Sequence, residues 1–265
     1  MLKSKRQTEI IDILKAENFA TVTDLSKRLY ASNPTIRRDL TLLESEGYVK
    51  RCHGGAMLTE SNSKPPIYFR REQNATAKVN ICRAAASLIH DRDVIFIDAS
   101  STAFHITDYI KKDSDITVIT NGLSISSKLS ETGFLTYSLG GRLLKESLAF
   151  VGKTAEDAID SYNADIMFFS VASVSENGIL SDWSEYEASL RIKMAKRSRC
   201  KVLLCDSSKF NKSSAFTLFP LDELSYIVTD APLSHELIKT YKLKLIKSEF
   251  AYMYSVRQDK NTRTV

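Results

Sequence analysis

One short segment combines a helix start with side chains that suit contact with DNA. Asn33 is a good N-cap residue, and Pro34 fits the first helical position, where its missing N–H costs nothing. Thr35, Arg37 and Arg38 follow near the positive end of the predicted helix dipole, where phosphates bind well. They lie off an apolar stripe formed by Ile36, Leu40 and Leu43. A polar and basic first turn is what reading the major groove requires, so this segment predicts DNA contact.

A second group of polar residues stands after predicted strands in the later part of the chain. Asp98 to Thr102 leads into a helix, and hydroxyls with backbone N–H groups at a helix start form a phosphate cradle. Gly140 to Arg142 adds two glycines that allow close backbone approach and an arginine that can reach a phosphate. The residues expected to bind a phosphorylated effector are Asp98, Ser100, Ser101, Thr102, Thr120, Asn121, Gly140, Gly141, Arg142, Asp206 and Lys209.

Each of these features also has a plainer interpretation. An arginine doublet alone is typical of a solvated helix face, and Asp39 fits an ion pair at the surface. Asp206 and Lys209 fit a surface ion pair as well, and a Ser-Ser-Thr run after a strand is more often a helix cap. Glu187 and Arg191, one helical turn apart, favour an exposed pair over a ligand contact. Polar groups at most successive strand ends nevertheless favour one shared site for a phosphorylated ligand.

The elements around the basic segment predict a winged helix-turn-helix. A first helix runs through Ile10 to Leu14, Thr23 caps a second, and the third ends near Gly47. Tyr48 to Arg51 is extended, and His53 to Ala56 turns it into a basic hairpin. The residues expected to contact DNA are Ser32, Asn33, Thr35, Arg37, Arg38, Lys50, Arg51 and His53.

Further along, short apolar runs rich in β-branched residues alternate with helical segments. Such runs fit strands that are buried on both faces of a parallel sheet. The expected strands are 94–97, 116–119, 166–169, 201–205 and 226–228. The expected helices are 75–88, 103–110, 124–130, 155–160, 185–197 and 233–241. The pattern predicts a doubly wound α/β domain that binds ligands where its strands end.

Charge and composition narrow the class of protein. Residues 1–72 hold 13 lysines and arginines against 9 acidic residues, and the remainder is nearly balanced, which points to a polyanion partner at one end. The four cysteines are scattered, so neither a metal site nor a disulfide framework is expected, and a reducing cytoplasm fits. No apolar run has transmembrane length and no signal sequence precedes the first helix, so we expect no membrane association and a cytoplasmic location. No feature calls for a cofactor.

Strings in both halves of the chain resemble the DeoR family of bacterial transcriptional regulators. The run Thr35 to Leu40, Thr-Ile-Arg-Arg-Asp-Leu, followed by His-Gly-Gly-Ala at His53 to Ala56, is characteristic of the N-terminal domain of that family. The C-terminal domain of the family is matched at Asp98–Thr102, where Ala99 and Ser100 replace a residue–glycine pair, at Thr120–Asn121, at Gly140–Gly141, and at Asp206, Ser208, Lys209 and Phe210.

The resemblance implies a fold, an effector class and one further site residue. It implies a small winged helix-turn-helix followed by a larger α/β domain similar to ribose-5-phosphate isomerase, which binds phosphorylated sugars or related metabolites. Glu187 stands where the family often has glutamate, which adds it to the expected effector site. The expected domains are residues 1–57 for DNA binding, 58–74 as linker and 75–265 for effector binding.

Two functions from different classes fit these features. The first is a transcriptional regulator without enzymatic activity, most often a repressor in this family, which controls a carbohydrate-metabolism operon. Such a regulator binds a double-stranded operator, and a bound phosphorylated sugar changes its affinity for that operator. The second is a sugar-phosphate isomerase with a DNA-binding appendage, in which Asp98, Asp206 and Lys209 serve acid–base steps. No other feature demands catalysis, which favours the regulator. One helix-turn-helix reads few base pairs, so we expect a homo-oligomer, a dimer or tetramer.

Overall fold

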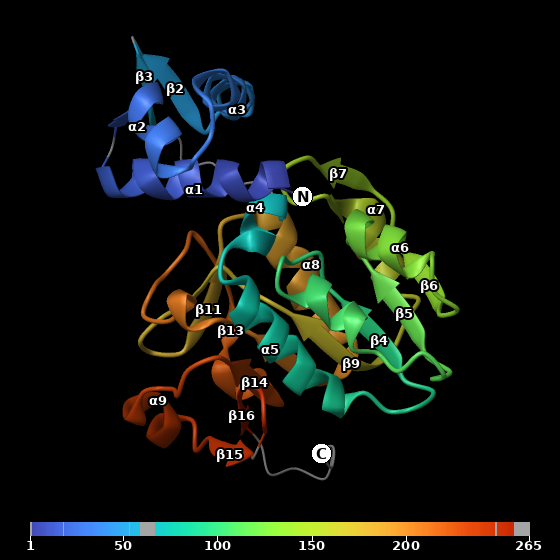
Figure 1. Cartoon of the computed structure of the whole chain (residues 1–265). Coiled ribbons are helices and arrows are strands. Elements are labelled where there is room, and N and C mark those ends of the chain that lie inside the picture. The colour runs from blue at the N-terminus through green and yellow to red at the C-terminus, as the bar shows by residue number, and fades with distance from the viewer. Residues whose placement is uncertain (1, 18, 53, 59–66, 247, 257–265) are drawn as a thin grey trace. The chain divides into compact units, whose positions relative to one another are not determined.

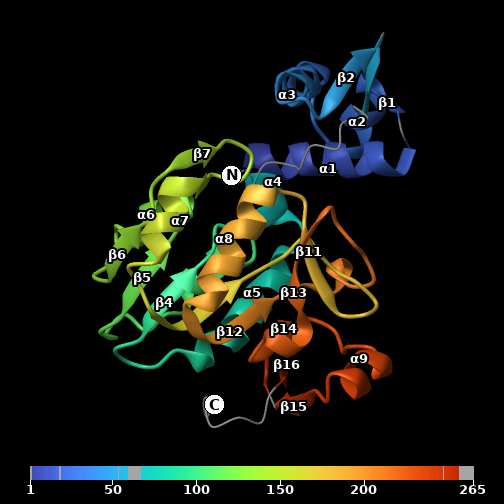
Figure 2. The ribbon, with the colours of Figure 1, turned by 180° about the vertical axis from the view of Figure 1, so that it is seen from behind.

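The chain folds into two units, whose ribbons are seen from opposite sides in Figures 1 and 2. The computed structural model describes residues 2–17, 19–52, 54–58, 67–246 and 248–256. The N-terminal unit comprises Met1–Gln73 and the C-terminal unit Asn74–Val265.

The N-terminal unit is a helical core with a three-stranded antiparallel sheet. Its helices are α1 (Leu2–Glu17), α2 (Val22–Arg28), α3 (Asn33–Ser45) and α4 (Ile67–Glu72). Its strands, paired in the order β1-β3-β2, are β1 (Phe19–Thr21), β2 (Val49–Cys52) and β3 (Gly55–Leu58). Side chains from α1, α2 and α3 form one core that includes Ile10, Leu14, Leu25, Ile36, Leu40 and Leu43. The predicted winged helix-turn-helix is confirmed.

The N-cap of α3 is displaced by one residue from its predicted place. Ser32, and not Asn33, has the extended backbone of a cap, and its hydroxyl accepts the N–H of Thr35 at 3.4 Å. Asn33 is instead the first helical residue. Pro34 is tolerated there because the N–H groups of the whole first turn lack helical partners.

The start of α2 also differs from the prediction. Thr21, and not Thr23, caps this helix, and its hydroxyl accepts the N–H of Asp24 at 3.0 Å. A cap must precede the first helical residue, and Thr23 already lies inside the helix. Thr21 also ends the unpredicted strand β1, which lies close to Gly55 of β3. A Cβ atom on Gly55 would stand 2.3 Å from the carbonyl oxygen of Ala20.

The segment expected to be a linker contains ordered structure at both ends. Leu58 completes β3, and Ile67–Glu72 forms α4, which lies against α1. Residues 59–66, the middle of that segment, are outside the described residues. A helix of six residues spans fewer than two turns, so no apolar periodicity could reveal it.

The C-terminal unit is built on an eight-stranded sheet with the order β15-β16-β14-β12-β9-β4-β5-β6. The six strands from β14 to β6 run parallel, whereas β16 and β15 pair antiparallel at one edge. The strands are β4 (Val94–Ile97), β5 (Thr117–Thr120), β6 (Leu135–Ser138), β9 (Ala164–Phe169), β12 (Ser198–Leu204), β14 (Tyr226–Thr229), β15 (Lys244–Ile246) and β16 (Tyr252–Ser255). All five predicted strands belong to this sheet.

Helices and smaller sheets surround it. The helices are α5 (Ala75–Ala85), η1 (Ala86–Leu88), η2 (Ala103–Asp108), α6 (Leu123–Leu129), α7 (Lys153–Ile159), α8 (Glu185–Lys196), η3 (Ser207–Lys209), η4 (Leu221–Glu223) and α9 (His235–Thr240). The other strands are β7 (Arg142–Leu144), β8 (Ala149–Val151), β10 (Ser173–Val174), β11 (Ile179–Asp182) and β13 (Phe216–Pro220). The segment predicted as helix 103–110 is a 3₁₀ helix and shorter than expected.

Both faces of the sheet are buried at its middle strands, as their apolar residues predict. Neighbouring residues alternate between two cores: Phe96 packs on one face, and Ile95 and Ile97 on the other. Helices α7, α8 and α9 cover the first face, and α5, η2 and α6 cover the second. This arrangement confirms the doubly wound α/β domain. Since the six strands are parallel, their carboxyl ends all lie on the same side of the domain.

Candidate functional site

Helix α3 and strand β2 lie side by side (Figure 1), and both carry basic residues. Four of the expected DNA contacts are exposed cations: Arg37, Arg38, Lys50 and Arg51. Arg51 ties the hairpin to the helix, because its guanidinium donates to Thr41 Oγ1 at 3.0 Å and its N–H to Glu44 Oε1 at 2.9 Å. Ser32 and Asn33 are exposed, whereas His53 lies outside the described residues.

Asp39 is the inward counterpart of these cations, which corrects its expected place at the surface. It is 0 % exposed, and its carboxylate accepts Arg6 Nε at 2.6 Å and Gln7 Nε2 at 3.1 Å. Both partners come from α1, which thus holds the buried side of α3. Helical spacing places Asp39 on the same side as the apolar stripe, and burial there requires a partner for its charge.

In the C-terminal unit, polar residues gather at one edge of the sheet because the six parallel strands end there. In spatial order from β14 to β6, the residues just after the strands include Asp230, Asp206, Ser170, Asp98, Asn121 and Gly140. Ser170 was not among the expected effector residues, although it directly follows the predicted strand 166–169, as Asp98 follows strand 94–97.

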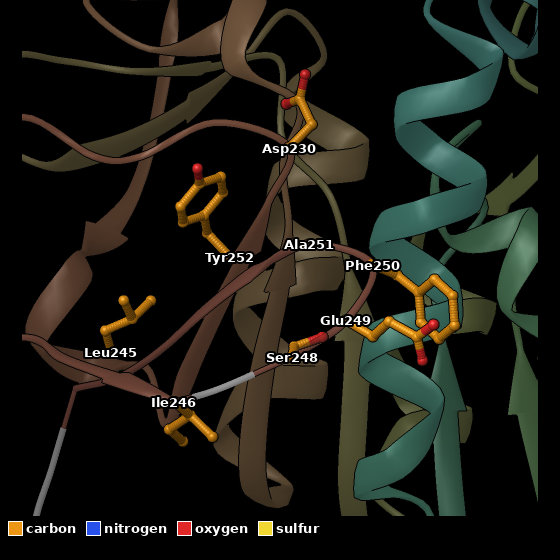
Figure 3. A pocket seen from close by; sticks show the side chains of 8 residues that line it. All are labelled: Asp230, Leu245, Ile246, Ser248, Glu249, Phe250, Ala251 and Tyr252. Carbon is orange, nitrogen blue, oxygen red and sulfur yellow. The ribbon is translucent and has the colours of Figure 1, made fainter.

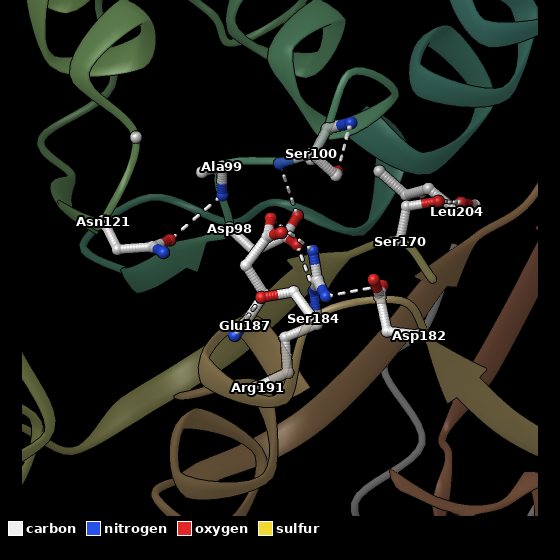
Figure 4. A network of polar contacts seen from close by, with 12 residues as sticks. Asp98, Ala99, Ser100, Asn121, Ser170, Asp182, Ser184, Glu187, Arg191 and Leu204 are labelled. Carbon is white, nitrogen blue, oxygen red and sulfur yellow. Dashed lines mark hydrogen bonds and ion pairs between the residues drawn. The ribbon is translucent and has the colours of Figure 1, made fainter. Parts of the chain in front are cut away.

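A buried ion cluster centred on Arg191 occupies the middle of this edge (Figure 4). The guanidinium donates to Asp98 Oδ2 at 2.6 Å and to Asp182 Oδ2 at 2.7 Å, and it lies 3.5 Å from Glu187 Oε1. The prediction that Glu187 and Arg191 form an exposed pair is wrong, since each is only 3 % exposed. Burial lowers the pKa of Arg191, but the charges of Asp182, Asp98 and Glu187 outweigh it and raise the pKa above its ordinary value.

The loop after β4 is held by its neighbours. Asn121 accepts the N–H of Ala99 at 3.0 Å and donates its own amide to the carbonyl of Phe150 at 3.2 Å. Ser100, the residue that replaces a family glycine, accepts the N–H of Ala103 at 3.1 Å and so helps to start η2. Two residues expected to bind the effector, Asn121 and Ser100, therefore make hydrogen bonds that stabilise the fold itself.

Thr102 differs from the other hydroxyl residues of this loop. It is 0 % exposed, and among the described residues its Oγ1 finds no hydrogen-bond partner. Its carbonyl accepts the thiol of Cys82 at 3.1 Å, and burial raises the pKa of that thiol, so the proton stays on sulfur. A buried hydroxyl without a partner is costly, which makes Thr102 a candidate for bonding to a ligand.

Asp206 and Lys209 form the second polar group of the edge. Lys209 Nζ donates to Ser170 Oγ at 2.8 Å and lies 3.8 Å from Asp206 Oδ2. Burial raises the pKa of Asp206, but the charge of Lys209 and a hydrogen bond from Ser208 outweigh it, so the pKa is lowered overall. The plainer interpretation of these two residues, a surface ion pair, is wrong, since the side chains of Asp206 and Lys209 are 2 % and 19 % exposed.

The local backbone conformation, and not only a ligand, explains glycine at the second position of the pair after β6. Gly141 has φ +105, and a Cβ atom there would stand 2.7 Å from the carbonyl oxygen of Val151. The next residue, Arg142, is exposed and stacks its guanidinium 4.3 Å from the ring centre of Tyr186 at the start of α8. Arg142 therefore places an exposed cation close to the start of α8.

Several cavities open in the described part of the C-terminal unit. One of about 360 Å³ opens between β15 and β16 (Figure 3). Others, of about 720 Å³ and 270 Å³, are lined mainly by residues near α5 and α9. None of the expected effector residues lines any of the three, but two of these cavities reach strand ends. Asp230 lines the first, and Ser207 and Thr229 line the one of about 270 Å³.

Among the described residues, no group of three His, Cys, Asp or Glu side chains could hold a metal ion. No helix in the described parts of both units has the length and apolarity that crossing a bilayer requires.

A helix-turn-helix with exposed cations, joined to an α/β unit with polar strand ends, defines a DNA-binding protein with a separate sensor. Family models agree: residues 6–62 match a DeoR-like helix-turn-helix domain and residues 73–231 a DeoR C-terminal sensor domain. The chain belongs to the DeoR family of transcriptional regulators. This confirms the predicted family and favours a regulator over an enzyme.

Individual relatives span nearly the whole chain. The putative aga operon transcriptional repressor of Escherichia coli O157:H7 is 30 % identical over 86 % of each chain. The L-fucose operon activator of Haemophilus influenzae is 32 % identical over 88 % of this chain and 94 % of its own. Among solved structures, ribose 5-phosphate isomerase A of Methanocaldococcus jannaschii covers 69 % of this chain and 79 % of its own, with 16 % identity and a TM-score of 0.40.

Proposed function

We propose that this regulator represses a carbohydrate-metabolism operon and that a phosphorylated sugar, bound at the strand ends, changes its affinity for the operator. In this proposal α3 enters the major groove and the β2–β3 hairpin contacts the sugar-phosphate backbone. The proposed DNA contacts are Ser32, Asn33, Thr35, Arg37, Arg38, Lys50, Arg51 and His53. The exposed cations on α3 and β2 support this assignment.

The observation that carries the sensor assignment is the convergence of six strand ends on one polar edge. Lys209 supplies a positive charge for a phosphate, and the unpartnered hydroxyl of Thr102 supplies a hydrogen bond. Carboxylates such as Asp98 accept hydrogen bonds from sugar hydroxyls. The relatives named for the aga and L-fucose operons support control of carbohydrate genes by this chain.

Regulation then requires two arrangements of the protein that differ in affinity for the sugar phosphate. A ligand with equal affinity for both arrangements would not change DNA binding at all. We also propose that the protein acts as a homo-oligomer, because paired helix-turn-helix units read paired half-sites.

The test is binding to DNA from the region upstream of its own gene, compared with random duplex of equal length and fixed salt. We expect preference for the upstream fragment, and weaker binding with glucose 6-phosphate, fructose 6-phosphate or fructose 1-phosphate present. Equal affinity for both duplexes under all conditions would refute the proposal. A coupled isomerase assay with the same sugar phosphates is the second arm. Turnover at ordinary enzymatic rates would replace the regulator by an enzyme.

A further inference from the structure

Asn74 is the first residue of the C-terminal unit and follows α4 of the N-terminal unit after Gln73. Its backbone is left-handed, with φ 52 and ψ 34, and it occupies the N-cap position of α5. Asparagine at an N-cap usually accepts a hydrogen bond from a backbone N–H of the first turn, but the side chain of Asn74 makes no such bond. The amide is used elsewhere.

That amide donates to the strand-end loop that holds Lys209. Asn74 Nδ2 lies 3.0 Å from Asp206 Oδ1 and 3.3 Å from Ser208 Oγ. The other oxygen of Asp206 lies 3.8 Å from Lys209 Nζ. One buried carboxylate therefore contacts both the proposed phosphate partner and the residue at the junction of the two units. A phosphate bound to Lys209 would compete with Asp206 for the ammonium and change the charge that Asn74 meets.

Contacts inside the N-terminal unit continue from the other side of the junction. Helix α4 lies against α1. Arg6 and Gln7 of α1 hold the buried carboxylate of Asp39, which belongs to α3. Contacts within the N-terminal unit thus connect α4 to α1 and α1 to α3, the helix proposed to enter the major groove. The connection from α4 to Asn74 is the polypeptide chain itself.

We infer that Asn74 is a positioning residue that couples the effector site to DNA binding, through its hydrogen bonds to Asp206 and Ser208. The inference rests on the proposed function and adds the route of regulation to it. It assigns Asn74 no contact with the effector or with DNA. Loss of its amide should uncouple the two activities while leaving each of them in place.

Asn74→Gly is the most direct variant, because glycine adopts the left-handed backbone without strain while the substitution removes the side chain and its amide. The matched control is Asn211→Gly. Asn211 also has a positive φ, 58, and lies just beyond the same loop. Asp206→Asn weakens the acceptor instead of removing the donor, and the double variant shows whether the two changes act on one bond.

The first measurement needs neither DNA nor effector. Backbone hydrogen exchange should rise about tenfold at residues 78–81, where the helical hydrogen bonds of α5 begin with the N–H of Lys78 to the carbonyl of Asn74, in Asn74→Gly and in Asp206→Asn, since a bond to a charged acceptor is lost. The double variant should exchange no faster than the faster single variant, and Asn211→Gly should match the parent. Unchanged exchange in Asn74→Gly, with the parent fold retained by circular dichroism, would overturn the inference.

The second measurement separates coupling from affinity. The ratio of upstream-DNA dissociation constants with and without the active sugar phosphate should fall from the parent value toward 1 in Asn74→Gly. Affinity for that sugar phosphate, followed by fluorescence of the single tryptophan Trp183, should stay within about threefold, since Asn74 makes no proposed ligand contact. An unchanged ratio would contradict the inference. If the parent itself shows a ratio of 1 with all three sugar phosphates, the proposed function fails, and the exchange experiment alone decides the role of Asn74.

Discussion

The two polar regions of this protein differ in how their charges are held. On α3 and β2, Arg37, Arg38 and Lys50 extend into solvent. At the strand ends of the sensor unit, by contrast, Asp98 and Arg191 are buried and bonded to each other. Exposed cations cost the free protein little and remain hydrated until a phosphate replaces the water. Buried charges must be paired inside the fold before any ligand arrives.

Substitutions on α3 should therefore change DNA affinity without changing stability, whereas substitutions in the Arg191 cluster should change effector response and stability together. Removing an exposed cation from α3 should weaken DNA binding and leave the free energy of unfolding nearly unchanged. Removing a charge from the Arg191 cluster leaves its partners buried and unpaired, so stability and effector response should fall together. The predictions below test that separation.

The largest effect is expected for Arg191→Ala. It leaves three buried carboxylates, those of Asp98, Asp182 and Glu187, without their shared cation. We expect the free energy of unfolding of the sensor unit to drop by about 3–5 kcal/mol, measured by urea denaturation. The control is Lys193→Ala on the same helix, whose partner Asp160 is 53 % exposed, and it should cost less than about 1 kcal/mol. Equal costs would mean that the cluster is not a buried support.

Arg38→Ala should act on DNA affinity alone. Loss of one phosphate or base contact weakens binding to the upstream DNA by about 1–3 kcal/mol, or roughly 5- to 150-fold. If the contact is to phosphate, the slope of log affinity against log salt should also fall by about 1. A gel-shift titration at several salt concentrations measures both quantities.

Two comparisons make the Arg38 result interpretable. Lys15→Ala removes the same charge from α1, where Lys15 pairs with Asp12 at the surface, and should change affinity far less. The urea midpoint of Arg38→Ala should match the parent. An affinity equal to that of the parent would remove Arg38 from the proposed DNA contacts.

Lys209→Ala should blunt the effector response and preserve DNA binding. The variant loses the charge proposed for the phosphate, so about tenfold more sugar phosphate should be needed for half-maximal release of DNA. The matched control is Lys212→Ala. Lys212 lies on the same loop, is exposed and donates to the carbonyl of Ser208 at 2.6 Å. A normal response in Lys209→Ala, or an equal loss in Lys212→Ala, would exclude Lys209 from the site.

The sequence predicts the elements of both regions better than their contacts. Strand 94–97 is found at the residues expected, because a short apolar run rich in β-branched residues favours a strand buried on both faces. The end of α3 near Gly47 is likewise confirmed, since Gly47 has the positive φ of 80 that the αL cap requires. The hairpin that follows is confirmed by the antiparallel pairing of β2 with β3. Neighbouring residues determine these features, so a short stretch of sequence is enough to predict them.

The ion cluster could not be predicted in the same way. Glu187 and Arg191 are four residues apart on a helix, a spacing shared by exposed and buried pairs. What buries them is the approach of Asp98 and Asp182 from two other segments, which only the tertiary fold brings together. Asn74 is a similar case, since its acceptor lies 132 residues along the chain.

The smallest predicted effect concerns the N-caps of α2 and α3, which the sequence prediction misplaced by two residues and by one residue. The Ser32 hydroxyl lies 3.4 Å from the N–H it accepts, whereas the Thr21 hydroxyl lies 3.0 Å from its own. Since hydrogen bonds weaken as they lengthen, Ser32→Ala should cost about 0.5 kcal/mol of stability and Thr21→Ala about 1 kcal/mol. Thr23→Ala, which removes no cap, should cost less than either. The order of the three urea midpoints checks this. A larger loss of DNA affinity than of stability in Ser32→Ala would show that its hydroxyl contacts DNA, whereas Thr21→Ala should lower stability without that excess.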